Sequence, residues 1–252
     1  MLKRIMSTAI IAGLVAGILV SVVHEFTTTP IILYAEEYEN SGENHHTLLQ
    51  DATQGGVKKA NVHSDTQGQI YLADTDSEDG QEEWGPNNRL ERTFFTSLAN
   101  ILTGVGFAAI LVACFTFSGE KLSGRRGVIW GLAGFAVFTL APSLGLPPEV
   151  PGSMAADLSL RQTWWIATSV ATGVGLWVMI FGSKTPIYLL GLLLIILPHV
   201  IGAPQPTEIG GNAPPELAGQ FVAASIVVSA IFWVILGWTS GALWKHSGDV
   251  AK

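Results

Sequence analysis

The sequence predicts an all-α integral membrane protein: a bundle of about six transmembrane helices, with a long acidic extracytoplasmic loop after the first helix. Three observations predict this class. Hydrophobic residues make up 48% of the 252 residues and charged residues only 13%, which is about half the charged share of a soluble domain. The apolar residues are gathered in long runs. Eight tryptophans are present, and tryptophan is enriched at membrane interfaces.

The apolar runs define the predicted spans. A hydrocarbon core about 30 Å thick requires about 20 apolar residues in a helix. Six runs approach or reach this length, and none carries a charged residue in its central part. The fifth is the shortest and contains Pro198 and His199 near its end, so a bundle of five spans is the alternative. The predicted spans are residues 5–23, 94–117, 127–146, 164–181, 186–201 and 220–238.

Basic residues predict the orientation of these spans, because loops rich in Lys and Arg stay in the cytoplasm. Such residues precede the first span, follow the sixth, and lie between the second and third and between the fourth and fifth. We therefore expect a multi-pass protein with both termini cytoplasmic. No small-residue cleavage motif follows the first run, so we expect it to be kept as an anchor and not removed as a signal peptide.

A polar insertion follows the first span. We expect residues 1–252 to form a single membrane domain, with residues 40–88 as a flexible extracytoplasmic insertion that has few residues able to build a core. Residues 24–93 hold 14 of the 20 acidic side chains. An acidic surface raises the local cation concentration and repels nucleic acid. Membrane lipid is therefore an expected partner, and nucleic acid is not.

Polar side chains gather toward the outer ends of the spans, which predicts a polar vestibule open to the outside. His24 follows the first span and His199 lies near the end of the fifth. Neutral imidazole is a common ligand of cobalt, nickel, zinc and copper. The alternative is that these polar groups only hold helices together. The candidate metal-ligating residues are His24, Glu25 and His199, with Glu36, Glu37 and Glu39 at the mouth of the vestibule.

Other motifs limit the function. The lone Cys114 excludes an internal disulfide framework and a cysteine-cluster metal site. The chain has no P-loop, dinucleotide-binding fingerprint, zinc-protease motif or nucleophile elbow. We therefore expect no enzyme and no tightly bound cofactor. Small-residue pairs at Gly13–Gly17 and Gly237–Gly241 predict close helix contacts, including contacts with a partner or a second copy in a homo-oligomer.

Five stretches stand in a characteristic order along the chain: AGLVAG, TPIILYAEEYE, LAPSLGLPPEVPG, RQTWW and LPHVIGAPQP. Together they resemble the CbtA family of proposed cobalt transporter subunits, nearly end to end except for the insertion. The resemblance implies a subunit in the bacterial inner (cytoplasmic) membrane that imports cobalt for cobalamin biosynthesis, with Co²⁺ or a similar divalent cation as transported substrate. It also implies a partner, CbtB, a small single-span protein with a histidine-rich tail. The family is usually given five spans, whereas hydropathy here predicts six.

Two other functions stay open at this point. The chain could be a non-transporting membrane scaffold or sensor subunit, whose glycine-lined helices bind a partner. It could also be a membrane-embedded enzyme that uses the His24–Glu25 pair, although no motif supports this. A metal-flux assay separates a transporter from a scaffold. The metal, the direction of transport and the energy source are not determined by the residues.

Overall fold

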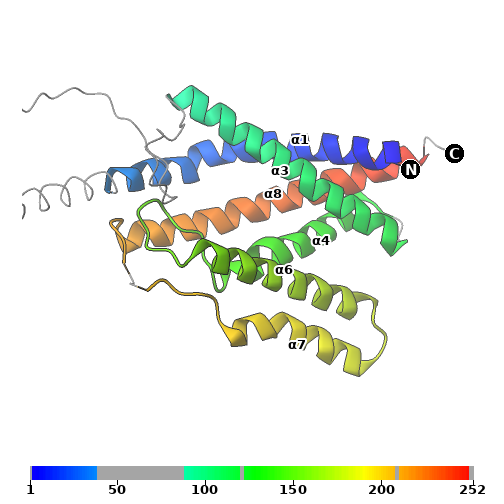
Figure 1. The fold of residues 1–252 in the computed structure, drawn as a ribbon. Coiled ribbons are helices and arrows are strands. Elements are labelled where there is room, and N and C mark those ends of the chain that lie inside the picture. The colour runs from blue at the N-terminus through cyan, green and yellow to red at the C-terminus, as the bar shows by residue number, and fades with distance from the viewer. Residues whose placement is uncertain (1, 39–87, 120–121, 208–209, 250–252) are drawn as a thin grey trace, which may run out of the picture.

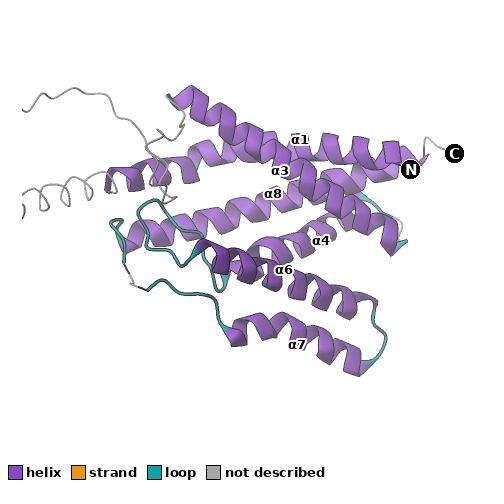
Figure 2. Ribbon diagram, in the orientation of Figure 1, coloured by secondary structure: helices purple, strands orange, loops and turns teal. Residues whose placement is uncertain are grey.

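The computed structural model confirms the all-α membrane class. It describes residues 2–38, 88–119, 122–207 and 210–249. Over these ranges the chain consists of helices and loops, with a single isolated bridge between Ser153 and Gly211 (Figure 2). Glu39 and residues 40–87 of the predicted insertion lie outside the described residues.

Five described helices are long and apolar enough to cross a membrane. The remaining one, the fifth predicted span, is α7, whose 17 residues measure about 25 Å at 1.5 Å per residue, less than a hydrocarbon core of about 30 Å. It ends where Gly202 adopts φ 89°, a conformation that favours glycine. The helices are α1 (Leu2–Phe26), α3 (Arg89–Ser118), α4 (Gly124–Phe135) continued by η1 and α5 to Ser143, α6 (Leu158–Phe181), α7 (Thr185–Ile201) and α8 (Pro215–Asp249).

The third span contains a π-helical turn. Between α4 and α5 (Ala141–Ser143), the segment η1 (Ala136–Leu140) is a π-helix, and the Ala141 amide donates to the Ala136 carbonyl. Pro142 explains the widened turn, because its ring would clash with the carbonyl four residues earlier in a regular helix. Such turns are rare and often occur at functional sites.

The central part of the bundle is made by α1, α3, α4 and α8. Helix α1 packs against α3 and α8, α4 packs against α8, and α7 contacts α6 alone among the described helices (Figure 1). The core between the central helices includes the buried side chains of Val112, Phe115 and Leu236. Both termini lie at one end of the bundle, where the Arg4 guanidinium lies 3.9 Å from the centre of the Trp244 ring.

Both predicted small-residue pairs form close helix contacts within this chain. A Cβ atom added to Gly17 would lie 2.6 Å from the Cα atom of Ile101 in α3. A Cβ atom added to Gly241 in α8 would lie 2.9 Å from the Cα atom of Gly127 in α4. The chain's own helices therefore occupy these two faces.

Replacing Gly17 with alanine should destabilise the bundle, because the new methyl group would force α1 and α3 apart. We expect the free energy of unfolding to fall by about 1–3 kcal/mol, the usual cost of overpacking. Gly106 in α3 provides the control, since an added Cβ atom there has no neighbour within 4 Å. Gly106→Ala should be neutral or stabilising by about 0.5–1 kcal/mol. Denaturant unfolding in detergent measures both, and equal stability of the two variants would contradict the α1–α3 contact.

Candidate functional site

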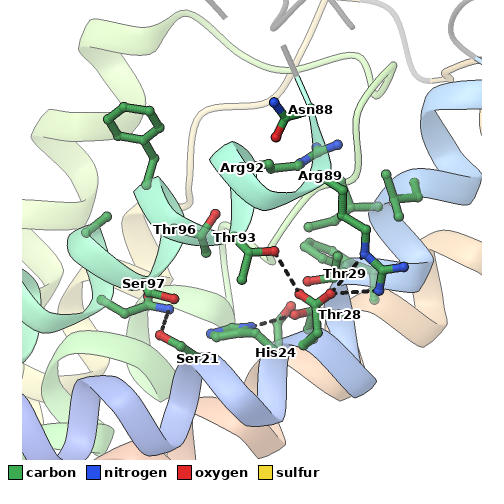
Figure 3. A pocket seen from close by; sticks show the side chains of 18 residues that line it. Ser21, His24, Thr28, Thr29, Asn88, Arg89, Arg92, Thr93, Thr96 and Ser97 are labelled. Carbon is green, nitrogen blue, oxygen red and sulfur yellow. Dashed lines mark hydrogen bonds and ion pairs between the residues drawn. The ribbon is translucent and has the colours of Figure 1, made fainter. Parts of the chain in front are cut away.

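A pocket of about 660 Å³ lies where α1 ends and α3 begins, and we call it the large pocket (Figure 3). Its walls are the last turns of α1, the helical residues 28–38, the first turns of α3 and Phe221 of α8. Phe95, Ile32 and Leu33 contribute apolar surface. The polar and charged wall residues are Ser21, His24, Glu25, Thr28, Thr29, Asn88, Arg89, Arg92, Thr93, Thr96, Ser97, Asn100 and Ser225.

The wall of residues 28–38 is a helix that continues the direction of α1 (Figure 1). The chain makes a turn at Thr27, whose amide donates to the His24 carbonyl at 3.1 Å. Pro30 falls in the first turn of the new helix, where its missing N–H would have no helical partner in any case. The stretch after the first span is therefore an ordered pocket wall.

Two ion pairs connect this wall and the end of α1 to the first turn of α3. Arg89 donates to Glu25 Oε1 through Nη2 at 2.8 Å and through Nε at 3.2 Å. Arg92 donates to the buried Glu36 carboxylate through both terminal nitrogens, Nη1 to Oε2 at 3.1 Å and Nη2 to Oε1. The side chain of Asn88 accepts the Glu91 amide and begins α3 at this point. Two of the four glutamates that the sequence placed at a cation path, Glu25 and Glu36, are thus bound to guanidinium groups.

His24 occupies the last turns of α1 with its ring held from one side. Its Nδ1 lies 2.5 Å from the Thr28 hydroxyl oxygen. When Nδ1 carries the proton and donates it to Thr28, the Nε2 lone pair is left available to a metal ion. Asn100 lies nearby on α3, and its side-chain amide donates to the Ser21 hydroxyl at 3.0 Å. Hydrogen bonds therefore fix the orientation of the His24 ring and of the Asn100 amide where α1 and α3 lie side by side.

A second, smaller pocket of about 170 Å³ adjoins the large one. His24 and Asn100 line both pockets, so these two residues form the junction between them. The small pocket also has hydroxyl groups on three different helices, because Thr103, Thr139 and Ser229 line it. Thr139 belongs to the π-helical turn. The recurrence of Ser97, Asn100 and Thr103 along the sequence therefore marks one polar face of α3 that runs from the large pocket into the small one.

Aromatic rings line the small pocket on the side away from the large pocket. Phe107 and Trp233 line it with their ring centroids 4.8 Å apart, and Phe232 contributes a third ring. Phe138 of the π-helical turn stacks on Trp233 at 5.7 Å with an interplanar angle of 4°. Each ring lies further from the His24 end of its helix than the polar groups do. The polar surface therefore ends against this aromatic cluster.

The family of the chain follows from comparison with known proteins. The model of the family described as probable cobalt transporter subunit (CbtA) matches residues 2–245. The chain belongs to the CbtA family. The match includes all described helices, among them the short α7, except for the last four residues of α8. Among curated proteins and among solved structures, no match to the chain is found. Membership of the CbtA family identifies the chain as a membrane protein and a probable cobalt transporter subunit.

The predicted metal ligands of this CbtA-family chain are not all brought together. His24 and Glu25 line the large pocket, whereas Glu37 is exposed and Glu39 lies outside the described residues. His199 lies on α7, where its ring contacts Trp164 with centroids 5.9 Å apart. Because α7 contacts only α6 among the described helices, His199 is separated from α1. Over the described ranges, no group of three or more His, Cys, Asp or Glu residues could hold a metal ion. The assignment of these side chains as ligands stays a prediction.

Sequence reasoning missed Arg89 and Arg92. A signal was present, because two arginines three residues apart precede the second span and lie on one helical face. Two glutamates stand just beyond the first span, at the same predicted membrane surface. Opposite charges at adjacent span ends predict ion pairs, but only if the two spans are neighbours in the bundle. Residues 40–88 separate the first and second spans in sequence, so the sequence did not show that these two spans pack against each other.

Proposed function

We propose that this CbtA-family chain is the membrane subunit through which cobalt, or a similar divalent transition metal, crosses the bilayer. The observation that carries the proposal is the meeting of two pockets at His24 and Asn100, inside a bundle whose family is a probable cobalt transporter subunit. An imidazole and an amide oxygen are suitable ligands for a cation that passes between the pockets. The aromatic cluster is the closed end of this route.

We propose further that the route runs inward from the outer face of the bacterial inner membrane and supplies cobalamin biosynthesis. The distribution of charge supports the orientation, since basic residues stand at the end of the bundle that carries both termini (Figure 1). The membrane potential favours entry of a divalent cation by about 2.3 kcal/mol per charge per 100 mV. The basic residues at that end are Lys3, Arg4, Arg125, Arg126, Lys184 and Lys245.

A small histidine-rich, CbtB-like membrane protein is the proposed partner. The described residues hold no three-ligand group of His, Cys, Asp and Glu, and we propose that the partner contributes ligands for capture of the metal at low concentration. A histidine-rich tail supplies them, because imidazole binds cobalt well. In this proposal the partner captures the metal ion, and the ion then crosses the membrane through this chain.

Uptake of radioactive cobalt tests the function directly. Cells that lack other cobalt importers are given this chain, the small partner, or both, and the cell-associated label is measured over time. We expect uptake above background only when this chain is present and the highest rate with both proteins. Background uptake from well-expressed, membrane-inserted protein, with and without the partner, would contradict the transport function and favour a scaffold or sensor subunit.

A further inference from the structure

The large pocket has far more room than a metal ion needs. Sites for small organic molecules usually measure about 300–1,000 Å³, and its volume of about 660 Å³ falls within this range. A cation with six waters, at roughly 30 Å³ per water, fills only about 180 Å³. The small pocket, of about 170 Å³, matches that size. The two pockets therefore suit different species.

The charges around the large pocket do not favour a bare cation. Glu25 is the only acidic side chain among the lining residues, and Arg89 binds it. Glu36, the partner of Arg92, is not among the lining residues and is buried behind them. Each carboxylate is thus paired with a guanidinium group, which leaves no free carboxylate here for a bare cation, whereas the N–H groups of Arg89 that Glu25 does not use can donate to an anion.

Arg89 is the group best placed to bind such an anion. Its side chain is 75% exposed, and its bond to Glu25 uses Nη2 and Nε, which leaves Nη1 to donate to a ligand. Guanidinium groups bind carboxylates with two parallel hydrogen bonds. Thr93 follows Arg89 along α3, and its hydroxyl donates to Glu25 Oε2 at 3.5 Å, beside the ion pair (Figure 3). The hydroxyl of Thr96 also lines the pocket. Phe221 offers apolar contact to the carbon skeleton of a ligand.

We propose that the large pocket binds the metal as a complex with a small organic chelator that carries carboxylate groups and is negatively charged overall. This inference rests on the proposed function, because it names the form in which the substrate arrives. The small pocket is too small for the chelator, so the metal exchanges its carboxylate ligands for His24 at the junction. The metal then continues alone, and the chelator leaves by the outer opening.

Binding of cobalt(II) citrate, with the citrate radioactively labelled, to the purified full-length protein in detergent tests this inference. We expect saturable binding that Arg89→Gln weakens about tenfold or more, since hydrogen bonds to charged groups contribute about 1.5–3 kcal/mol. Arg125→Gln is the matched control, because Arg125 is an exposed arginine at the opposite end of the bundle. It should bind like the unaltered protein.

Glu25→Gln separates an anionic complex from a bare cation. This change removes the carboxylate that competes for Arg89, so binding of cobalt citrate should be kept or strengthened. A site for free cobalt would instead lose a ligand and weaken. Binding of free cobalt chloride that Glu25→Gln reduces, without binding of the citrate complex, would overturn the inference.

Two further outcomes separate the inference from the function on which it rests. Uptake of free cobalt without citrate binding would leave the transport function standing and overturn the chelate site. Citrate binding without any cobalt uptake would support the anion site and contradict transport. Binding of the protein to vesicles of anionic phospholipid is the last comparison. If anionic lipid binds in an Arg89-dependent way and cobalt citrate does not bind, the guanidinium groups hold a lipid phosphate and the chelate proposal fails.

Discussion

Cobalt uptake is expected to fall about 10- to 100-fold when His24 is replaced by alanine, the range found when groups that position or bind a metal are removed. His24 is the imidazole at the junction of the two pockets, and Thr28 holds its Nδ1. A cation that passes from the large pocket to the small one must pass this ring. Initial rates of radioactive cobalt uptake, normalised to the amount of membrane-inserted protein, measure the effect.

His199→Ala is the matched control for this experiment. His199 lies on α7, which contacts α6 and none of the other described helices, so it is separated from the junction. The variant should keep most of the uptake, although the sequence grouped both histidines as candidate ligands. The opposite pattern, with uptake lost in His199→Ala and kept in His24→Ala, would show that the route runs past α6 and α7 and not through the two pockets.

Replacing Arg92 with glutamine should destabilise the folded protein by about 3 kcal/mol, the lower end of the cost of breaking a buried ion pair from one side, because Arg92 is only partly buried. The side chains of Arg92 and Glu36 are 21% and 10% exposed. Without the guanidinium group, the Glu36 carboxylate is left in a poorly hydrated site between the helix of residues 28–38 and α3. Denaturant unfolding in detergent measures the loss, and the free energy of unfolding is the quantity to compare.

Arg89→Gln is the control, because the Arg89–Glu25 pair comes from the same turn of α3 but Arg89 is 75% exposed. Exposed ion pairs contribute about 0–1 kcal/mol, so this variant should unfold almost like the unaltered protein. Replacing Glu36 and Arg92 together by glutamine should recover part of the stability lost in Arg92→Gln, since no unpaired charge is then buried. Equal destabilisation by both single arginine changes would contradict the difference in burial.

The helices could be predicted from the sequence because hydropathy is a property of consecutive residues. All six predicted spans correspond to helices, and α7, predicted as the weakest, is the one too short to meet the length of a span. The predicted ends were less accurate. Helix α8 continues to Asp249, well beyond Trp238, because hydropathy predicts only the apolar part of a helix, and Gly241 serves as a contact with Gly127 of α4 and not as a helix end.

The candidate site could be predicted only in part. His24 and Glu25 were identified because they stand at the end of an apolar run, where polar groups are conspicuous. Arg89 and Arg92 were missed because their partners are 64 and 56 residues away in sequence. The grouping of His199 with His24 assumed that residues at one membrane depth are neighbours, whereas depth gives no position in the plane of the membrane.

The sequence by itself determined the class of this protein, its membrane-spanning segments, its charge asymmetry and its resemblance to CbtA proteins. Each of these depends on the order and composition of residues along one chain. Only the tertiary structure decided that α1 lies against α3 and α8, that two glutamates pair with arginines, and that two pockets meet at His24 and Asn100. These features depend on which helix faces pack together. Glycine contacts and ion pairs between distant segments select that packing, and hydropathy is the same for every arrangement of the helices in the plane of the membrane.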